Sequence, residues 1–179
     1  MDFSTEHEVH AEAIASMVTA SFTASEGPGE GALIGTLARR LIAETPTGDL
    51  RVFTAWEDGA PVGGIFFTRL AYEGDPRSIY MMAPVAVATA HQGKGLGQRL
   101  IAHGLAALRQ QGVDIVVTYG DPAFYGRVGF KPVSESDLPA PRPLGQPHGW
   151  MAQSLTEAPL TPVRGPARCV ASFDDPALW

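Results

Sequence analysis

The sequence has one cysteine and no excess of positive charge, and each scarcity excludes a class of protein. Cys169 is the only cysteine among 179 residues, so the chain cannot form an internal disulfide or a zinc site of several thiolates. We expect Cys169 to be a small buried side chain and not a reactive thiol. Lysine and arginine number 13 against 19 aspartate and glutamate residues, which gives a net charge of -6. Since nucleic-acid affinity depends largely on basic side chains, we do not expect a nucleic-acid partner.

Long apolar segments and the common nucleotide-binding motifs are also missing. No stretch approaches the roughly 20 apolar residues of a membrane span, and the N-terminal residues MDFSTE lack the basic flank and apolar run of a signal peptide. We therefore expect a cytoplasmic protein without a membrane partner. Gly95 follows Lys94 where a P-loop needs Ser or Thr, and Gln98 stands where the dinucleotide fingerprint G-x-G-x-x-G needs glycine.

The pattern of apolar residues predicts an alternation of helices and strands. Helical spacing is found over residues 7–22 and 33–42, with a polar break expected at 25–31. We expect strands at residues 50–56, 62–72, 79–87 and 113–119, the first two joined by the turn at 57–59. The nearly continuous apolar run at 79–87 indicates a central strand. Two further helices are expected at residues 93–111 and 122–127, with Gly112 as the C-cap of the first and Asp121 as the N-cap of the second.

Proline is concentrated near the C-terminus. Residues 132–166 carry eight of the 15 prolines, so we expect mostly loop there, with strands at 150–155 and 168–173. The order of elements predicts an α/β protein with a single mixed sheet flanked by helices. We expect one domain over residues 1–179, in which 2–133 form the core and 134–179 supply the proline-rich loop and the late strands.

Three glycines stand at the start of the helix expected at 93–111. Gly93, Gly95 and Gly97 would each cost a helix about 1 kcal/mol relative to alanine, so we infer that something approaches this backbone closely. A helix N-terminus exposes unpaired N–H groups and a partial positive charge, which together bind anions. Lys94 adds a full positive charge. The alternative is a glycine-rich turn that only lets the helix pack tightly on its strand.

This segment resembles a motif of the GCN5-related N-acetyltransferase (GNAT) family. Val85-Ala86-Val87, a short spacer and Gln92-Gly93-Lys94-Gly95-Leu96-Gly97 match the Q/R-x-x-G-x-G/A pattern that follows the family's fourth strand. Residues 121–130 resemble its second signature, with the aromatic pair Phe124-Tyr125 four residues before Gly129-Phe130. The resemblance implies a GNAT-like acyl-CoA N-acyltransferase fold, acetyl-coenzyme A (acetyl-CoA) as co-substrate and no metal.

The resemblance also implies which residues bind the cofactor. The backbone at 85–87 would pair with the pantetheine arm like an added strand, in a splay between 85–87 and 117–119. The N–H groups from Gly93 to Gln98 would hold the pyrophosphate, and Asp121 would lie near the pantetheine unless it serves only as a helix cap. The implied cofactor-binding residues are Val85, Ala86, Val87, Gln92, Gly93, Lys94, Gly95, Leu96, Gly97, Gln98 and Asp121.

Tyr125 stands where family members carry the tyrosine that protonates the departing CoA sulfur. A phenol with a pKa near 10 is a neutral donor at pH 7, which suits that role. The alternative is a core aromatic side chain, and Tyr119 is a weaker rival donor. No general base is assigned, because residues 78–87 contain no carboxylate or histidine. The loose candidates for that base are Glu26, Glu30, Glu73, His91 and His148.

The sequence therefore predicts an N-acetyltransferase that moves an acetyl group from acetyl-CoA to a primary amine of a small molecule or peptide, by direct transfer in a ternary complex. Two alternatives stay open: a non-catalytic acyl-CoA-binding or regulatory module, and an acyltransferase acting on protein or charged RNA. The proline-rich loop would form a wall of the acceptor pocket, with His148 and Trp150 facing the acceptor unless Trp150 fills the core. The amine acceptor and the oligomeric state are not identified, and a homodimer is left open.

Overall fold

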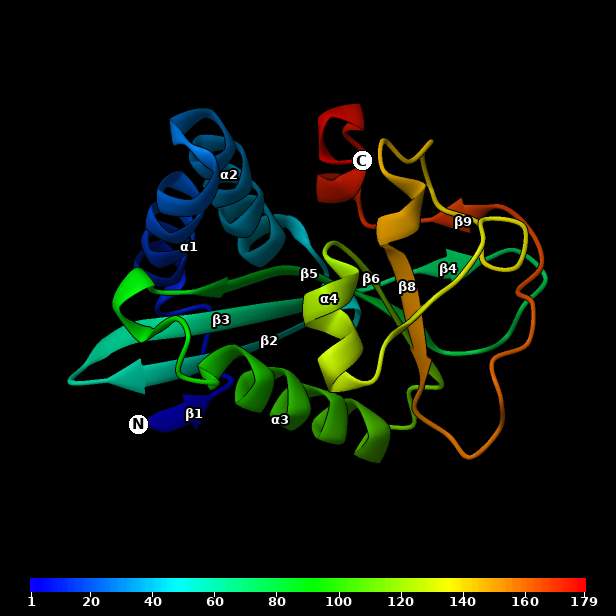
Figure 1. Ribbon diagram of the computed structural model, residues 1–179, viewed down its shortest axis with the longest axis horizontal. Coiled ribbons are helices and arrows are strands. Elements are labelled where there is room, and N and C mark those ends of the chain that lie inside the picture. Colours follow the sequence, from blue (N-terminus) through cyan, green and yellow to red (C-terminus); the bar gives the residue numbers. More distant parts are fainter. The chain divides into compact units, whose positions relative to one another are not determined.

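The computed structural model describes residues 1–179, and most of its strands form one mixed sheet (Figure 1). The sheet has seven strands in the order β1-β2-β3-β5-β6-β8-β7. The bounds of these strands are β1 Asp2–Ser4, β2 Leu50–Glu57, β3 Ala60–Arg69, β5 Ile79–Val87, β6 Ile115–Tyr119, β7 Lys131–Pro132 and β8 Trp150–Ser154. β5 and β6 are parallel, whereas β6 and β8 are antiparallel. The mixed sheet and the central place of β5 confirm the predicted fold class.

Four α-helices accompany the sheet: α1 Ala11–Glu26, α2 Pro28–Glu44, α3 Leu96–Gln110 and α4 Pro122–Tyr125. A β-carbon at Gly64 of β3 would lie 3.3 Å from Met17 of α1, and one at Gly63 would lie 3.3 Å from Leu100 of α3. Because successive strand residues point to opposite faces, α1 and α3 cover opposite faces of β3. None of the helices combines the length and apolar character of a membrane span.

The contacts divide the chain into two compact units. One contains residues 1–67 and 84–104, and the other contains residues 68–83 and 105–179. The first unit includes α1, α2, all of β2, most of β3, the end of β5 and the start of α3. The second includes β6, α4 and the C-terminal strands. The expectation of one domain over residues 1–179 stays a prediction.

The predicted break between the first two helices is shorter than expected. α1 runs to Glu26 and α2 begins at Pro28, so only Gly27 separates them. Gly27 has a φ of 96°, a conformation open to glycine. Pro28 does not interrupt the helix because the first helical position needs no N–H donor.

The hairpin turn between β2 and β3 and the C-cap of α3 lie where the sequence predicted them. The turn between β2 and β3 places Asp58 at φ 50° and Gly59 at φ 76°, which is the backbone of a two-residue hairpin loop. Gly112 ends the α3 region with φ 79°. In contrast, α3 begins at Leu96 and not at Gly93, because Gly93 and Gly95 have φ values of 70° and 74° that no helix contains.

The other strand predictions were partly wrong. The expected strand at 62–72 divides, since β3 ends at Arg69 and β4 (Ala71–Tyr72) pairs with β9 (Ala167–Arg168) in a separate two-stranded sheet. The expected strand at 168–173 is limited to Arg168, and Ala171–Phe173 form a 3₁₀ turn. β1 and β7 were missed because elements of three and two residues carry no readable alternation. Cys169 is half-buried, and this burial raises the pKa of its thiol.

The proline-rich segment, which is part of the second unit, accepts several side-chain hydrogen bonds at its carbonyl groups. The Tyr72 hydroxyl donates to the Pro139 carbonyl at 2.7 Å, and the Trp150 indole N–H donates to the Leu138 carbonyl at 2.8 Å. The Arg77 guanidinium donates to the carbonyl groups of Thr161 and Pro162 at 3.2 and 3.0 Å. These contacts hold the segment at two places, Leu138-Pro139 and Thr161-Pro162.

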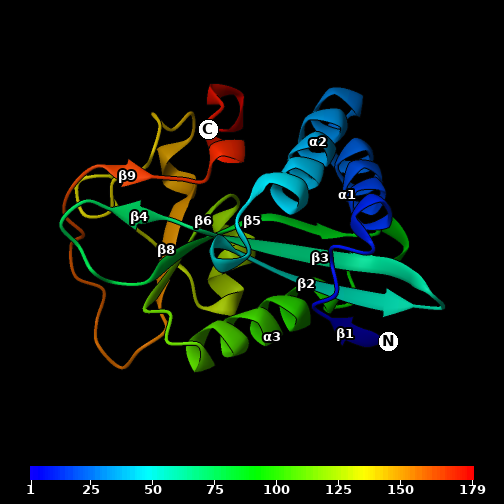
Figure 2. The ribbon, with the colours of Figure 1, turned by 180° about the vertical axis from the view of Figure 1, so that it is seen from behind.

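α1 and α2 lie side by side in both views of the ribbon (Figures 1 and 2), and glycines make their close approach possible. A β-carbon at Gly31 would lie 2.8 Å from the Thr19 carbonyl oxygen and would overlap the Thr23 hydroxyl. The backbone cannot retreat from such a contact as a flexible side chain can.

We expect Gly31→Ala to lower the free energy of unfolding by about 1–3 kcal/mol through overpacking. The same substitution at Gly29, whose β-carbon would meet nothing within 4 Å, is the matched control. There the higher helix propensity of alanine should leave stability unchanged or raise it. Urea denaturation of the two variants measures the difference, and equal midpoints would contradict the close-packing argument.

Candidate active site

The end of β5 presents backbone groups away from β3. The Ala88 N–H donates to the Val62 carbonyl of β3 at 2.9 Å, and the Ala86 carbonyl oxygen lies near Gly63 of the same strand. Because peptide groups alternate in direction along a strand, those of Val85 and Val87 point away from β3. Pairing between β5 and β6 covers Ile79–Met82 and ends before these residues. Val85 and Val87 can therefore pair with an extended ligand.

Ala86 and the expected splay need a correction. The peptide groups of Ala86 face β3 and its side chain is buried, so its backbone is not available to a ligand as the sequence predicted. Val117 and Thr118 pair with Met81 and Met82. Val117 and Thr118 therefore lie inside the paired part of β5 and β6. Of the three residues expected to border the splay, only Tyr119 lies beyond that pairing.

The loop that leads into α3, residues 92–95, is named the glycine loop here. All four residues are exposed, and a β-carbon at Gly93 or Gly95 would meet no atom within 4 Å. The glycines are thus required by their positive φ, and the space beside them is open on the outer side. For Gly93 and Gly95, this open space excludes the alternative that they only allow tight packing inside the protein.

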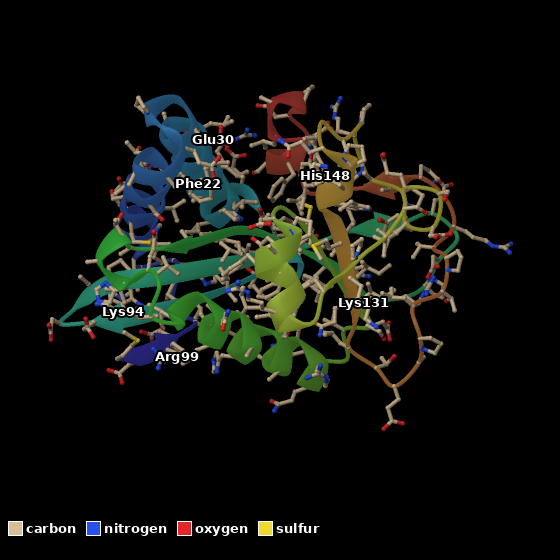
Figure 3. The ribbon with its side chains drawn as sticks, viewed as in Figure 1. Phe22, Glu30, Lys94, Arg99, Lys131 and His148 are labelled. Atoms are coloured by element: carbon tan, nitrogen blue, oxygen red, sulfur yellow. The ribbon has the colours of Figure 1, made fainter.

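The start of α3 supplies the donors of an anion site. The Arg99 N–H makes the first helical bond, to the Gly95 carbonyl at 3.1 Å, which leaves the N–H groups of the preceding turn without helical partners. Leu96 and Gly97 are buried, so only their N–H groups can contribute to such a site, while Gln98 is half-buried. Lys94 extends from the loop beside this helix end (Figure 3). These residues fit a bulky anion such as a pyrophosphate.

His91 connects the chain just before the glycine loop to the end of β2. Its Nε2 atom lies 2.6 Å from the Glu57 carboxylate, and this contact lowers the pKa of Glu57. The imidazole is therefore engaged with the carboxylate at the end of β2. Of the other base candidates, Glu26, Glu73 and His148 are exposed, Glu30 is half-buried in the first turn of α2, and Glu73 pairs with Arg168.

Asp121 caps α4 in the second unit. One carboxylate oxygen accepts the Ala123 N–H at 2.8 Å, and Pro122 occupies the first helical position. This geometry confirms the predicted N-cap. The contact of Asp121 with pantetheine stays a prediction.

Tyr125 is the last residue of α4, and its ring lies against Gly120, where a β-carbon would come within 2.7 Å of it. Its ring centroid is 5.1 Å from that of Phe124 and 6.0 Å from that of Phe130. Burial raises the pKa of Tyr125 to about 12, the neighbouring Thr118 hydroxyl lowers it, and Asp121 raises it further. The phenol is therefore a neutral proton donor at neutral pH.

Tyr119 and Trp150 are held by other contacts. The Tyr119 hydroxyl accepts the Gln146 N–H at 2.7 Å, and its ring stacks on Trp179 with 6.4 Å between centroids. Trp150 is fully buried and donates to the Leu138 carbonyl. The interpretation that Trp150 faces an acceptor was wrong, because it is a core side chain.

Sequence reasoning missed Ser21 and Thr118. Ser21 lies on α1 and donates to the Val87 carbonyl at 2.8 Å, and the buried Thr118 donates to the Met82 carbonyl at 2.9 Å. Neither residue belongs to a motif, and no sequence signal marks them. No group of three or more His, Cys, Asp or Glu side chains is arranged to hold a metal ion.

Comparison with known proteins identifies the class to which this fold and glycine loop belong. Residues 48–132, which include the glycine loop and Tyr125, match the family model described as an acetyltransferase (GNAT) domain. The chain is 39% identical over 126 residues to the Escherichia coli K12 protein named uncharacterized N-acetyltransferase YjhQ, a match that covers 68% of this chain and 69% of YjhQ. The protein is an acyltransferase.

Solved structures agree with this class over nearly the whole chain. The crystal structure of the GNAT family N-acetyltransferase YhbS from Escherichia coli in complex with CoA has a TM-score of 0.82 and 28% identity, covering 97% of this chain and 92% of YhbS. A GNAT acetyltransferase from Brucella melitensis in complex with acetyl-CoA has a TM-score of 0.71 and 27% identity, covering 97% of each chain. The chain belongs to the GNAT family.

Proposed function

We propose that the protein transfers an acetyl group from acetyl-CoA to a primary amine of a small molecule or peptide, by direct transfer in a ternary complex. The observation that carries this proposal is the exposed glycine loop at the N-terminus of α3, with its open space and unpaired N–H groups. Membership of the GNAT family and the CoA and acetyl-CoA complexes of two relatives support it.

The cofactor contacts follow from the backbone directions. The N–H groups of residues 93–98 would hold the pyrophosphate, with Lys94 adding a positive charge. Val85 and Val87 would pair with the pantetheine arm along β5. Asp121 is proposed near the pantetheine in addition to its role as a helix cap.

Tyr125 is proposed as the general acid. Transfer of the acetyl group to the amine breaks the thioester bond, and Tyr125 donates its phenolic proton to the departing sulfur. The acceptor must lose a proton before it attacks, since a primary amine with a pKa near that of lysine, about 10.4, is mostly protonated at neutral pH. No side chain is assigned to that step.

The experiment that tests the proposal measures release of free thiol from acetyl-CoA across a panel of amines, polyamines, amino acids and peptides. Thiol release that depends on one class of amine supports the proposal. Retention of intact acetyl-CoA with every amine and peptide would instead support a binding or regulatory module. Turnover only with a protein or charged RNA would support the other alternative. The cytoplasmic location and a homodimer stay predictions.

We expect Lys94→Ala to weaken CoA binding about three- to fivefold, because an exposed charge contributes at most about 1 kcal/mol while the backbone N–H groups persist. The loss should shrink as salt is added, since screening weakens an exposed charge. Calorimetric titration at two ionic strengths measures both effects. Lys131→Ala, which removes an exposed lysine of β7 (Figure 3), is the control and should bind CoA like the parent protein.

A further inference from the structure

The peptide group that joins Val87 to Ala88 is held at both ends. Its carbonyl oxygen accepts two side-chain donors, the Ser21 hydroxyl at 2.8 Å and the Gln92 amide at 2.9 Å. Its N–H, that of Ala88, donates to the Val62 carbonyl at 2.9 Å. A carbonyl oxygen has two lone pairs, so this one has no capacity left for a ligand.

Two donors of Gln92 are engaged within the protein. Its backbone N–H donates to the Thr89 carbonyl at 3.3 Å, and its side-chain amide reaches back five residues to Val87. The side-chain amide nitrogen carries two N–H bonds, and the Val87 carbonyl takes one of them, so the side-chain contact that the structure gives Gln92 is to the backbone of β5. Gln92, the first residue of the Q-x-x-G-x-G segment, thus links the start of the glycine loop back to the end of β5.

Ser21 approaches the same carbonyl from α1. Its side chain is only 6% exposed, and its partner lies 66 residues away in the sequence. A buried hydroxyl without a partner would cost about 1–3 kcal/mol, so this bond satisfies Ser21 while it ties α1 to the end of β5. Two elements distant in sequence therefore converge on one peptide group.

We propose that Ser21 and Gln92 are positioning residues that fix the Val87–Ala88 peptide group, so that the N–H of Val87, which points away from β3, faces the pantetheine arm. This inference rests on the proposed function and deepens it. Val87 then serves the cofactor as a hydrogen-bond donor only. Gln92 acts on the cofactor through Val87 and is not itself a phosphate ligand.

The test compares two probes by calorimetric titration: CoA, and 3′-phosphoadenosine 5′-diphosphate, which keeps the pyrophosphate but lacks the pantetheine arm. Gln92→Met and Ser21→Ala each remove one donor, and each should weaken CoA binding about three- to tenfold, the effect of one hydrogen bond. Binding of the truncated probe should change less than twofold. The double variant should lose more than the product of the single losses, because each donor holds the carbonyl when the other is absent.

Matched controls make the same substitutions elsewhere in the chain. Ser16→Ala changes an exposed serine of α1, and Gln110→Met changes an exposed glutamine at the end of α3. Both should bind the two probes like the parent protein. Gln92 is exposed, so its replacement tests the proposal even if Ser21→Ala lowers stability.

Each other outcome is decisive. Equal losses for both probes in Gln92→Met would overturn the proposal and make Gln92 a phosphate ligand. Unchanged CoA binding in the double variant would overturn it as well. A parent protein that binds neither probe would refute the proposed function, which separates that failure from a failure of this inference.

Discussion

Gly95→Glu is expected to abolish measurable CoA binding. Gly95 lies in the exposed glycine loop directly before α3, and a side chain added there would extend into the open space where the pyrophosphate is proposed to lie. A carboxylate at that point would repel the phosphates and shield the N–H groups behind it. Both effects oppose the binding of an anion by the N–H groups at the N-terminus of α3.

The control must account for backbone strain. Gly95 has a φ of 74°, so any side chain there costs about 1–2 kcal/mol of stability. Gly74 has a φ of 87°, is exposed and also has open space around its β-carbon. Gly74→Glu should therefore lose similar stability and keep its affinity for CoA. Calorimetric titration and thermal unfolding of both variants measure these quantities, and undiminished affinity in a folded Gly95→Glu protein would refute the anion site.

Tyr125→Phe is expected to lower kcat about 100-fold or more, the effect typical of a positioned general acid. The substitution removes the phenolic proton and keeps the ring that lies against Gly120, Phe124 and Phe130. Affinity for acetyl-CoA should change little, because the lost interaction belongs to the transition state. The measurement is kcat with a competent amine, together with calorimetric binding of acetyl-CoA.

Tyr119→Phe provides the comparison between the two candidate donors. The Tyr119 hydroxyl already accepts the Gln146 N–H, and we expect its removal to change kcat by less than about threefold. A large loss in Tyr119→Phe with full activity in Tyr125→Phe would exchange the two roles. Full activity in both variants would show that protonation of the thiolate, a good leaving group, does not limit the rate.

The pH dependence of kcat offers a further check on Tyr125. Burial raises its pKa to about 12, so the phenol keeps its proton at every pH well below that value. An acid that must be protonated loses activity only as the pH rises through its pKa. We therefore expect no fall in kcat from this group between pH 7 and about pH 10. A fall in that range that Tyr125→Phe abolishes would contradict the raised pKa.

Local sequence signals located the parts of the fold that depend on a single backbone requirement. Asp121 and Pro122 identified the start of α4, and Asp58-Gly59 identified the hairpin, because each position needs those residue types. The strand at 79–87 was found at its full length as β5 because it is buried along most of its run. The expected strand at 168–173 failed because Ala171–Phe173 form a 3₁₀ turn, and an apolar run alone does not distinguish such a turn from a strand.

The candidate site likewise has features that the sequence revealed and features that it did not. The glycine loop was readable because positive φ values require glycine. The alternation that turns Ala86 toward β3 depends on the register between β5 and β3, which is decided by the folded sheet. Ser21 was unreadable for a related reason, since its partner is a backbone carbonyl and any residue at position 87 would supply one.

The anchoring of the proline-rich segment has a consequence for sequence variation. Its fixed points at Leu138, Pro139 and Pro162 are carbonyl oxygens, which every residue type carries, while Thr161 contributes both its carbonyl and its hydroxyl. Between these points the path of the chain still depends on the buried side chains of β8, such as Trp150, whereas the exposed side chains are largely uncoupled from that path. A library randomised at the exposed positions of this segment should retain the fold while presenting many different surfaces, which makes it a natural place for related proteins to diverge and for engineering to begin.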